Sequence, residues 1–331
     1  MNVVDMHCDT ISRLLDKEIA GEKVSLRWND CNVDLKKMQK GDYLLQNFAC
    51  FVYLGNGVDP VKRAHQLIDH YYRQIEANSD LIAPVFCYDD IEKNRSKGLM
   101  SALLTIEEGG VVANDLALLR NYYRLGVRMV TLTWNFSNGI GHPNFENKGI
   151  RNFQDMKQIN TEDGLTEFGI QYIREMERLG MIIDVSHLSD AGFYDVLKYT
   201  KKPFVASHSN ARSVCDVARN MSDDMIIKLA ERGGVMGINF CGDFLKQSET
   251  GGERSEIQDM VKHILYIKKL AGIDCIGLGT DFDGIAPNLE ISDASMMPLL
   301  KEALEQAGLS EEEIEKIFYR NVLRVYQEVL K

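Results

Sequence analysis

The sequence predicts an α/β protein, a closed (β/α)8 barrel of the TIM type. Eight short apolar, β-branched runs recur along the 331 residues, and stretches with helical periodicity separate several of them. Such alternation is typical of a parallel sheet whose strands are joined by crossover helices. Polar residues follow directly after the apolar runs, which is where barrel enzymes place their catalytic groups. Both observations favour a closed barrel over an open doubly wound sheet.

The predicted strands are the apolar runs themselves. They cover residues 2–6, 45–52, 101–106, 128–133, 181–185, 204–207, 235–240 and 275–279. Helical periodicity is clearest in residues 170–179, 224–232 and 260–270, which lie between later strands. Ser310 stands before three glutamates as a helix cap, so residues 310–330 are expected to form a closing helix.

We expect one catalytic domain over residues 1–331, because α/β barrels reach this length as a single domain. A composition of 45% hydrophobic and 26% charged residues is that of a globular protein with a large core. The net charge of -11, which no stripe of lysines and arginines offsets, argues against a nucleic-acid partner.

The cysteines and the N-terminus predict a cytoplasmic protein. Seven scattered cysteines without CxxC spacing argue against a disulfide framework. The start of the chain lacks the pattern of a secretory signal, and no apolar run reaches the roughly 18 residues of a membrane span. No membrane partner is therefore expected. The oligomeric state stays open, with a homodimer as the commonest assembly among soluble oligomers.

His7 and Asp9 follow the first apolar run. Positions i and i+2 of a strand project to the same side, so the imidazole and the carboxylate converge where the strand ends. Nitrogen and oxygen ligands of this kind suit a divalent metal such as zinc. A hydrogen-bonded structural histidine is the alternative for this fragment alone.

Two further histidines, His187 and His208, end buried strands. An ionisable group costs free energy there unless it is paired or coordinated, which favours a functional role. A satisfied structural histidine is again the alternative. By contrast, His65, His70 and His263 lie among polar residues of amphipathic stretches and are expected at the surface.

Acidic residues also follow predicted strands. Glu108 precedes two glycines, and a carboxylate beside glycines can approach two cations because nothing bulky blocks that side. Strand periodicity does not decide between Glu108 and its neighbour Glu107. Of Asp281 and Asp283, one is expected to be a ligand or proton carrier and the other a cap or turn residue.

Together these residues comprise three histidines, two carboxylates and a further aspartate. This set matches a two-metal hydrolase with one bridging carboxylate and a bridging hydroxide. No GxGxxG follows the first strand and no GxxxxGK[ST] occurs, which argues against the common types of nucleotide-binding site. Residues 135–163, rich in asparagine, glycine and charged residues, are expected to form a long loop over the barrel mouth.

The sequence resembles the membrane dipeptidase (renal dipeptidase) family of zinc peptidases, in the amidohydrolase superfamily. The resemblance runs through nearly the whole chain, and its motifs are specific in combination. They are His7-x-Asp9, Glu108-Gly109-Gly110, Gly164-Leu165-Thr166 with Phe168-Gly169, Ile183-Asp184-x-x-His187, Ser207-His208-Ser209, Arg219-Asn220 and Gly279-x-Asp281-Phe282-Asp283-Gly284.

The resemblance implies a (β/α)8 barrel that holds two zinc ions. One ion would be held by His7 and Asp9 and the other by His187 and His208. Glu108, which the resemblance favours over Glu107, would bridge the two. The resemblance also implies that Arg219 binds the substrate's terminal carboxylate, a task that suits its bidentate fork. Asp281 would carry the proton from the bridging water to the leaving amine.

One position departs from the family's pattern. Its best-known members have a histidine after the strand that corresponds to residues 128–133, where it contacts the substrate, and this chain has Trp134. An indole can donate one hydrogen bond but cannot carry a positive charge. Either Trp134 stabilises the oxyanion differently, or Asn135 or His142 from the following loop takes that role.

The resulting expectation is a cytoplasmic zinc dipeptidase that acts on dipeptides with a free C-terminal carboxylate, a D-residue at that position included. Manganese and cobalt accept the same ligand types as zinc. The alternative within the superfamily is a hydrolase of N-acyl amino acids, lactones or phosphoesters. A catalytically silent binding protein is the remaining alternative, although clustered carboxylates and imidazoles are costly without a cation.

Overall fold

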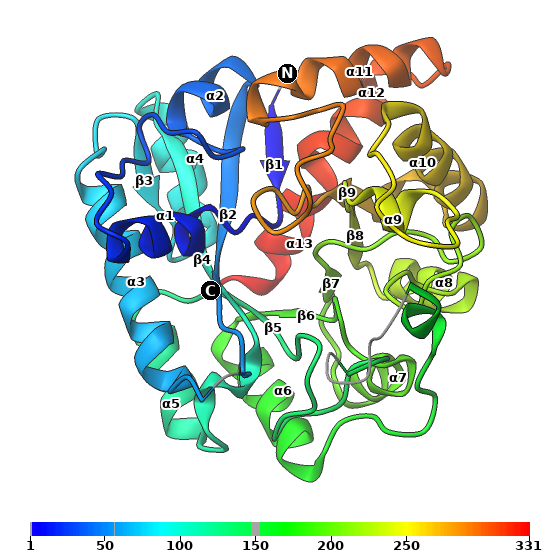
Figure 1. Ribbon diagram of the computed structural model, residues 1–331, viewed down its shortest axis with the longest axis horizontal. Coiled ribbons are helices and arrows are strands. Elements are labelled where there is room, and N and C mark those ends of the chain that lie inside the picture. Colours follow the sequence, from blue (N-terminus) through cyan, green and yellow to red (C-terminus); the bar gives the residue numbers. More distant parts are fainter. Residues whose placement is uncertain (1, 56, 147–152) are drawn as a thin grey trace.

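The computed structural model describes residues 2–55, 57–146 and 153–331, and its strands form a barrel inside a ring of helices (Figure 1). The strands are β1 (Val3–Asp5), β2 (Tyr43–Phe51), β3 (Ile82–Pro84), β4 (Met100–Glu107), β5 (Met129–Thr131), β6 (Ile182–Asp184), β7 (Val205–Ala206), β8 (Val235–Ile238) and β9 (Ile276–Leu278). All pair in parallel, in the order β1-β2-β4-β5-β6-β7-β8-β9, and β9 returns to β1. The predicted (β/α)8 barrel and its eight predicted strands are confirmed.

The additional strand β3 was not predicted. It pairs with Met100–Ala102 at the start of β4, whereas β5 pairs with Thr105–Glu107 at the end of β4. Its three residues Ile82-Ala83-Pro84 contain one β-branched side chain and a proline, so they do not resemble a buried strand in the sequence. β3 therefore pairs with the part of β4 that β5 leaves unpaired.

Helices connect the strands and cover the outside of the barrel (Figure 1). They are α1 (Thr10–Ile19), α2 (Leu35–Lys40), α3 (Pro60–Glu76), α4 (Tyr88–Ser96), α5 (Leu116–Arg124), α6 (Glu167–Leu179), α7 (Asp190–Tyr199), α8 (Asp223–Glu231), α9 (Gly242–Leu245), α10 (Ile257–Ala271), α11 (Met297–Gln306), α12 (Glu311–Glu315) and α13 (Asn321–Val329). The three predicted helical stretches form α6, α8 and α10. None of the helices within the described ranges is long and apolar enough to cross a membrane.

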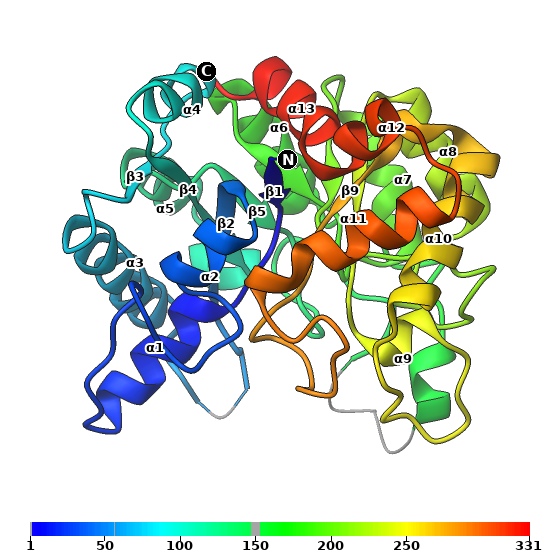
Figure 2. The same ribbon diagram turned by 90° about the horizontal axis from the view of Figure 1, so that it is seen from above.

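The C-terminal helices close one end of the barrel. Ser310 caps α12 in a reciprocal capping box with Glu313, and a π-helical turn leads from α12 into α13. The apolar face of α13, which includes Val322 and Tyr326, packs against residues at the N-terminal ends of the strands. Figure 2 shows α13 on the side of the barrel opposite α9. The prediction of a closing helix is confirmed, and a substrate must enter from the α9 side.

Two of the three histidines expected at the surface are buried. His65 on α3 is exposed, but His70 on the same helix and His263 on α10 are fully buried. His263 accepts a hydrogen bond from the backbone N–H of Ala211 and lies 3.0 Å from the carbonyl oxygen of Leu245, and burial lowers its pKa to about 4. The prediction was wrong because polar neighbours along a helix do not fix the direction in which one histidine points.

The predicted mouth loop, residues 135–163, contains residues 147–152, which lie outside the described residues. Within its described part, the only helix is the short 3-10 helix η3 (Phe153–Lys157). Asn144 ties this loop to α7, because its side chain donates to Asp190 and accepts the backbone N–H of the same residue. The described part of the loop therefore packs against the barrel beside the ends of β5 and β6.

Candidate active site

Six ionisable side chains gather above the C-terminal ends of the barrel strands. They form three groups whose ligand atoms lie within 4.8 Å of one another: His7 with Asp9 and Glu107, Glu107 with His187 and His208, and His7 with His208 and Asp281. His7 and Asp9 follow β1, and the other four residues end or follow β4, β6, β7 and β9, so the barrel closure brings together positions that are far apart in sequence. Imidazole and carboxylate ligands at this spacing suit divalent metal ions.

Glu107 lies at the centre of this cluster, and its two carboxylate oxygens face different partners. Oε2 lies 3.4 Å from Nε2 of His7, while Oε1 lies 3.1 Å from Nε2 of His187 and 3.6 Å from Nε2 of His208. Burial raises the pKa of Glu107, and the charge of His7 opposes that shift. A carboxylate shared in this way is placed to bridge two cations.

The sequence-based choice of Glu108 as the shared carboxylate is corrected to Glu107. Strand β4 ends at Glu107, whose side chain points into the barrel mouth, whereas Glu108 has a φ of 96° and leaves the strand direction. Its carboxylate accepts the backbone N–H groups of Gly110 and Trp134 and the side-chain amide of Asn138. Burial raises the pKa of Glu108 to about 7, and these donors oppose the shift. Glu108 therefore holds a turn together.

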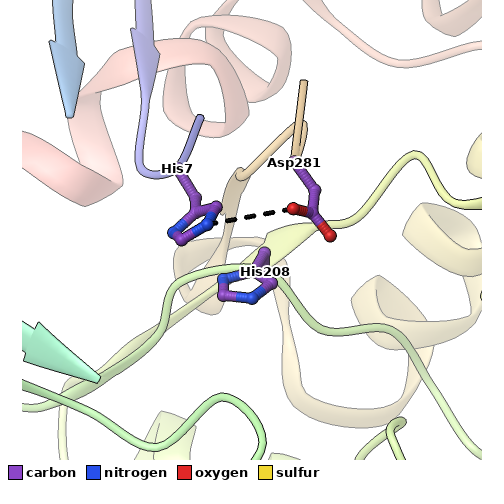
Figure 3. A group of neighbouring side chains, drawn as sticks. All are labelled: His7, His208 and Asp281. Atoms are coloured by element: carbon purple, nitrogen blue, oxygen red, sulfur yellow. Dashed lines mark ion pairs between the residues drawn. The ribbon is translucent and has the colours of Figure 1, made fainter. Parts of the chain in front are cut away.

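The ring of His7 is buried among acidic side chains. Its nitrogens have no hydrogen-bond partner among the described residues, but Nε2 lies 3.4 Å from carboxylate oxygens of Asp9 and Glu107. Figure 3 shows its ring facing the Asp281 carboxylate and lying beside the ring of His208, at a centroid distance of 3.8 Å. Burial lowers the pKa of His7, but Glu107 and Asp9 more than offset this and raise it well above its usual value. The surrounding carboxylates therefore favour a positive charge at this point, which a bound cation would supply beside a neutral His7.

The other two histidines are held neutral, as a metal ligand requires. Burial lowers the pKa of both His187 and His208 well below its usual value, and the charges of Arg219 and His7 act in the same direction. Nδ1 of His187 lies 2.9 Å from the amide oxygen of Asn135, and the two Nε2 atoms lie 3.0 Å apart. Asn135 therefore orients the ring of His187.

A buried aspartate in β6 supports His208. Asp184 accepts hydrogen bonds from the hydroxyls of Ser207 and Thr131, each at 2.6 Å, and from the backbone N–H of Ser186. The Ser207 hydroxyl in turn lies 2.7 Å from Nδ1 of His208. Such an outer layer fixes the tautomer and orientation of a ligand histidine. Sequence reasoning assigned Asp184 no role of its own, although an aspartate inside an apolar strand was a signal.

A second buried aspartate holds the backbone beside His7. Asp5 in β1 accepts the backbone N–H of His7 at 3.2 Å, and the backbone N–H and hydroxyl of Thr280 at 2.9 and 2.7 Å. These bonds tie the end of β1 to the turn after β9, and that turn carries Asp281. Asp5 was also missed in the sequence, where it precedes His7 by two residues.

Asp281 and Asp283 lie in different surroundings. The carboxylate of Asp281 lies 3.8 Å from Nε2 of His7 and accepts the side-chain amide of Asn239 at 2.8 Å. Burial raises the pKa of Asp281 to about 7, against the charge of His7. Asp283 instead accepts the Thr10 hydroxyl and a backbone N–H of the loop before α2, and is a turn residue.

Arg219 lies beside the histidine pair. It is buried, and its terminal nitrogens donate to the Ser209 hydroxyl at 3.0 Å and to the carbonyl oxygen of His208 at 2.9 Å. Its Nε has no hydrogen-bond partner in the described parts of the chain. Arg219 and His187 both line a very small cavity of about 10 Å³. The guanidinium is thus anchored next to the cluster with one donor uncommitted.

A larger cavity of about 480 Å³ opens over the cluster. Its walls include Asp9, Glu107, His187, Asp281, Phe51, Trp134 and Asn135. Of the three candidates for the substrate-contacting position, Trp134 and Asn135 therefore reach the cavity. His142 is not among the residues that line it, and its Nδ1 lies 2.8 Å from the hydroxyl of Ser137. The structure thus places His142 away from the reaction site.

The chain is similar to known peptidases over its full length. A profile of the membrane dipeptidase family, peptidase family M19, matches residues 1–331. A protein from Schizosaccharomyces pombe, described as an uncharacterized dipeptidase, is 36% identical over 309 residues, which are 89% of this chain and 72% of that protein. An uncharacterized Klebsiella pneumoniae protein is 33% identical over 240 residues, 72% of this chain and 86% of its own.

Solved structures agree with this fold. A metallopeptidase from Rhodobacter sphaeroides, liganded with a phosphinate mimic of the dipeptide L-Ala-D-Ala, superposes with a TM-score of 0.89 at 24% identity over 99% of each chain. An amidohydrolase from Pseudomonas aeruginosa superposes with a TM-score of 0.77 at 26% identity over 89% of this chain and 92% of its own. The chain therefore belongs to the membrane dipeptidase family, peptidase family M19, and is a metallo-dipeptidase.

Proposed function

We propose that this protein is a binuclear zinc dipeptidase that hydrolyses dipeptides with a free C-terminal carboxylate. The observation that carries the proposal is the position of Glu107. One of its oxygens faces His7, whose partner is Asp9, and the other faces the pair of His187 and His208. Two such half-sites joined by one carboxylate fit two metal ions. Manganese or cobalt would accept the same ligands.

When bound, two divalent cations would polarise the peptide carbonyl and lower the pKa of a water molecule enough for attack at neutral pH. Asp281 is the residue that would move the proton. Its buried carboxylate takes the proton released when the water oxygen bonds to the carbonyl carbon, and it delivers that proton to the amine as the C–N bond breaks. Two free amino acids result. Asn239 holds the carboxylate in place for both steps.

Arg219 would hold the substrate. A guanidinium that is already buried and oriented by two hydrogen bonds loses little freedom when it pairs with a carboxylate. Its uncommitted Nε would gain a partner in that complex. The Rhodobacter sphaeroides structure carries a mimic of L-Ala-D-Ala, which supports a dipeptide with a C-terminal D-residue as a substrate for this chain as well.

The test is hydrolysis of L-Ala-D-Ala by zinc-loaded enzyme, compared with L-Ala-L-Ala, N-acetyl-D-Ala and a chelated control. We expect chelator-sensitive cleavage of the dipeptides, with metal analysis giving two ions per chain. Cleavage of the N-acetyl substrate alone would make the protein a deacylase. Metal-loaded protein that cleaves none of these substrates would contradict the proposal.

Replacing Arg219 should separate carboxylate recognition from catalysis. For Arg219→Met we expect kcat/KM for L-Ala-D-Ala to fall by a factor of about 30 or more, because losing a buried charged hydrogen bond costs about 2–5 kcal/mol. L-Ala-D-alaninamide, which lacks the carboxylate, should lose much less. Equal losses for both substrates would mean that Arg219 does not recognise the carboxylate.

We further propose that residues 1–331 act as one catalytic domain in the cytoplasm. All seven cysteines are free in the structure, which supports a reducing compartment. The proposed partner is a small dipeptide substrate. The proposal includes no nucleic acid and no membrane as a partner.

A further inference from the structure

Phe51, Tyr53, Trp134 and Phe136 form an aromatic cluster, called here the aromatic wall, beside the cavity over the metal-ligand cluster. Phe51 ends β2 and Trp134 follows β5, so the wall stands on both sides of β4 and Glu107. Its rings pack against one another, with centroid distances of 5.1 Å from Phe51 to Trp134 and 5.1 Å from Tyr53 to Phe136. Phe51 and Trp134 line the cavity directly.

The wall is held in place by the turn that follows β4. The backbone N–H of Trp134 donates to the buried carboxylate of Glu108 at 3.0 Å, and the indole lies 6.1 Å from the ring of His187. Tyr53 also contacts the indole, at a centroid distance of 5.6 Å. Rings fixed from several sides present a preformed apolar surface, and a ligand that packs on it orders few side chains.

Arg219 stands on the other side of the cluster. It follows β7, and its guanidinium packs over Phe244 in α9, after β8. In the closed barrel, the centre of the wall at β4 lies opposite β8. A dipeptide whose carboxylate meets Arg219 and whose peptide carbonyl lies over Glu107 would therefore extend its N-terminal residue toward the wall.

The two cavities differ in room. Arg219, His187 and Asn135 line a small one of about 10 Å³, which is close to the space of one water molecule. The cavity bounded by the wall measures about 480 Å³ and continues across the cluster to Phe244. A large side chain at the N-terminal residue of the dipeptide therefore fits beside the wall.

We propose that the aromatic wall makes this enzyme selective for dipeptides with an aromatic or bulky apolar N-terminal residue. The inference rests on the proposed dipeptidase function and assigns Trp134 a role in substrate selection. An aromatic side chain gains both burial and edge-to-face contacts with the wall, whereas a methyl group reaches little of it. Trp134 thus selects the substrate by apolar contact.

The first test compares kcat/KM of the zinc-loaded enzyme for L-Phe-D-Ala, L-Ala-D-Ala and L-Ala-D-Phe. We expect L-Phe-D-Ala to exceed L-Ala-D-Ala about tenfold or more, since apolar pockets discriminate by roughly 10–200-fold per small group. L-Ala-D-Phe, whose phenyl group is on the other residue, should not show this gain. If dipeptides are cleaved without preference for L-Phe-D-Ala, this inference is overturned and the proposed function stands. If no dipeptide is cleaved, both this inference and the proposed function are contradicted.

Variants of the wall then test whether its residues cause the preference for L-Phe-D-Ala. Trp134→Ala should reduce the ratio of kcat/KM for L-Phe-D-Ala over L-Ala-D-Ala severalfold, and Phe51→Leu, a milder change, should reduce it in the same direction. The matched control is Trp28→Ala, because Trp28 is 76% exposed and the chain has two tryptophans. An unchanged ratio in both wall variants would overturn the proposal.

A binding measurement gives a readout besides activity. In Trp28→Phe, Trp134 is the single remaining tryptophan, so its emission reports on the wall. Titration with a phosphinate mimic of L-Phe-D-Ala should change this emission, and the mimic of L-Ala-D-Ala should change it much less. Equal responses at saturation would mean that the phenyl group does not reach Trp134.

Discussion

Glu107→Gln is expected to abolish metal binding and hydrolysis. Both oxygens of Glu107 face ligand histidines, and an amide supplies one weaker acceptor oxygen in place of two charged ones. Losing an outer-layer partner of a metal ligand already costs about 10–100-fold, so losing the shared ligand should cost at least about 100-fold in kcat/KM. Metal content by mass spectrometry and the rate of L-Ala-D-Ala hydrolysis measure the two effects.

Glu108→Gln is the matched control, because the same substitution is made one residue away. Glu108 accepts three N–H groups in a turn and faces none of the histidines. We expect this variant to retain its metals, while an amide that faces backbone donors lowers the free energy of unfolding by about 1–3 kcal/mol. If Glu108→Gln lost the metals and Glu107→Gln kept them, the assignment of the bridging carboxylate would be reversed.

Asp281→Asn should remove the proton carrier while leaving the metals bound. A positioned general acid–base group contributes about 10²–10⁴-fold, and kcat should fall by that order. The Asn239 contact can persist through the amide oxygen of the new side chain. Metal content is the companion measurement: loss of one ion per chain would show that Asp281 acts as a ligand and not as a proton carrier.

The pH profile gives an independent readout of Asp281. To accept a proton the carboxyl must be ionised, so activity should fall as the pH drops below its pKa. Burial raises that pKa to about 7 in the protein alone, and bound cations would lower it, so the acid limb of the metal-loaded enzyme should lie below pH 7. This limb should be absent in Asp281→Asn. Asp283→Asn, which alters a turn bonded to Thr10, should keep it.

The sequence predicted the barrel because its periodic pattern is local. Each buried parallel strand must be an apolar run. Eight such runs with helices between them are compatible with only a few α/β architectures. The same logic located His7, Asp9, His187 and His208, since the residue that follows a barrel strand lies at the mouth. Strand β3 was not predicted because three residues that pair with one end of a neighbouring strand need not form an apolar run.

The sequence by itself determined the fold class, the positions of its eight barrel strands and the types of ionisable side chain at the barrel mouth, because these follow from patterns within a few residues. Only the tertiary structure shows that Glu107, and not Glu108, faces the histidines, because this depends on the residue at which β4 ends and the backbone turns to a positive φ. It also decided that His263 is buried, and that the aromatic wall and Arg219 face each other across the cluster. Those relations depend on barrel closure, which joins side chains that no local pattern connects.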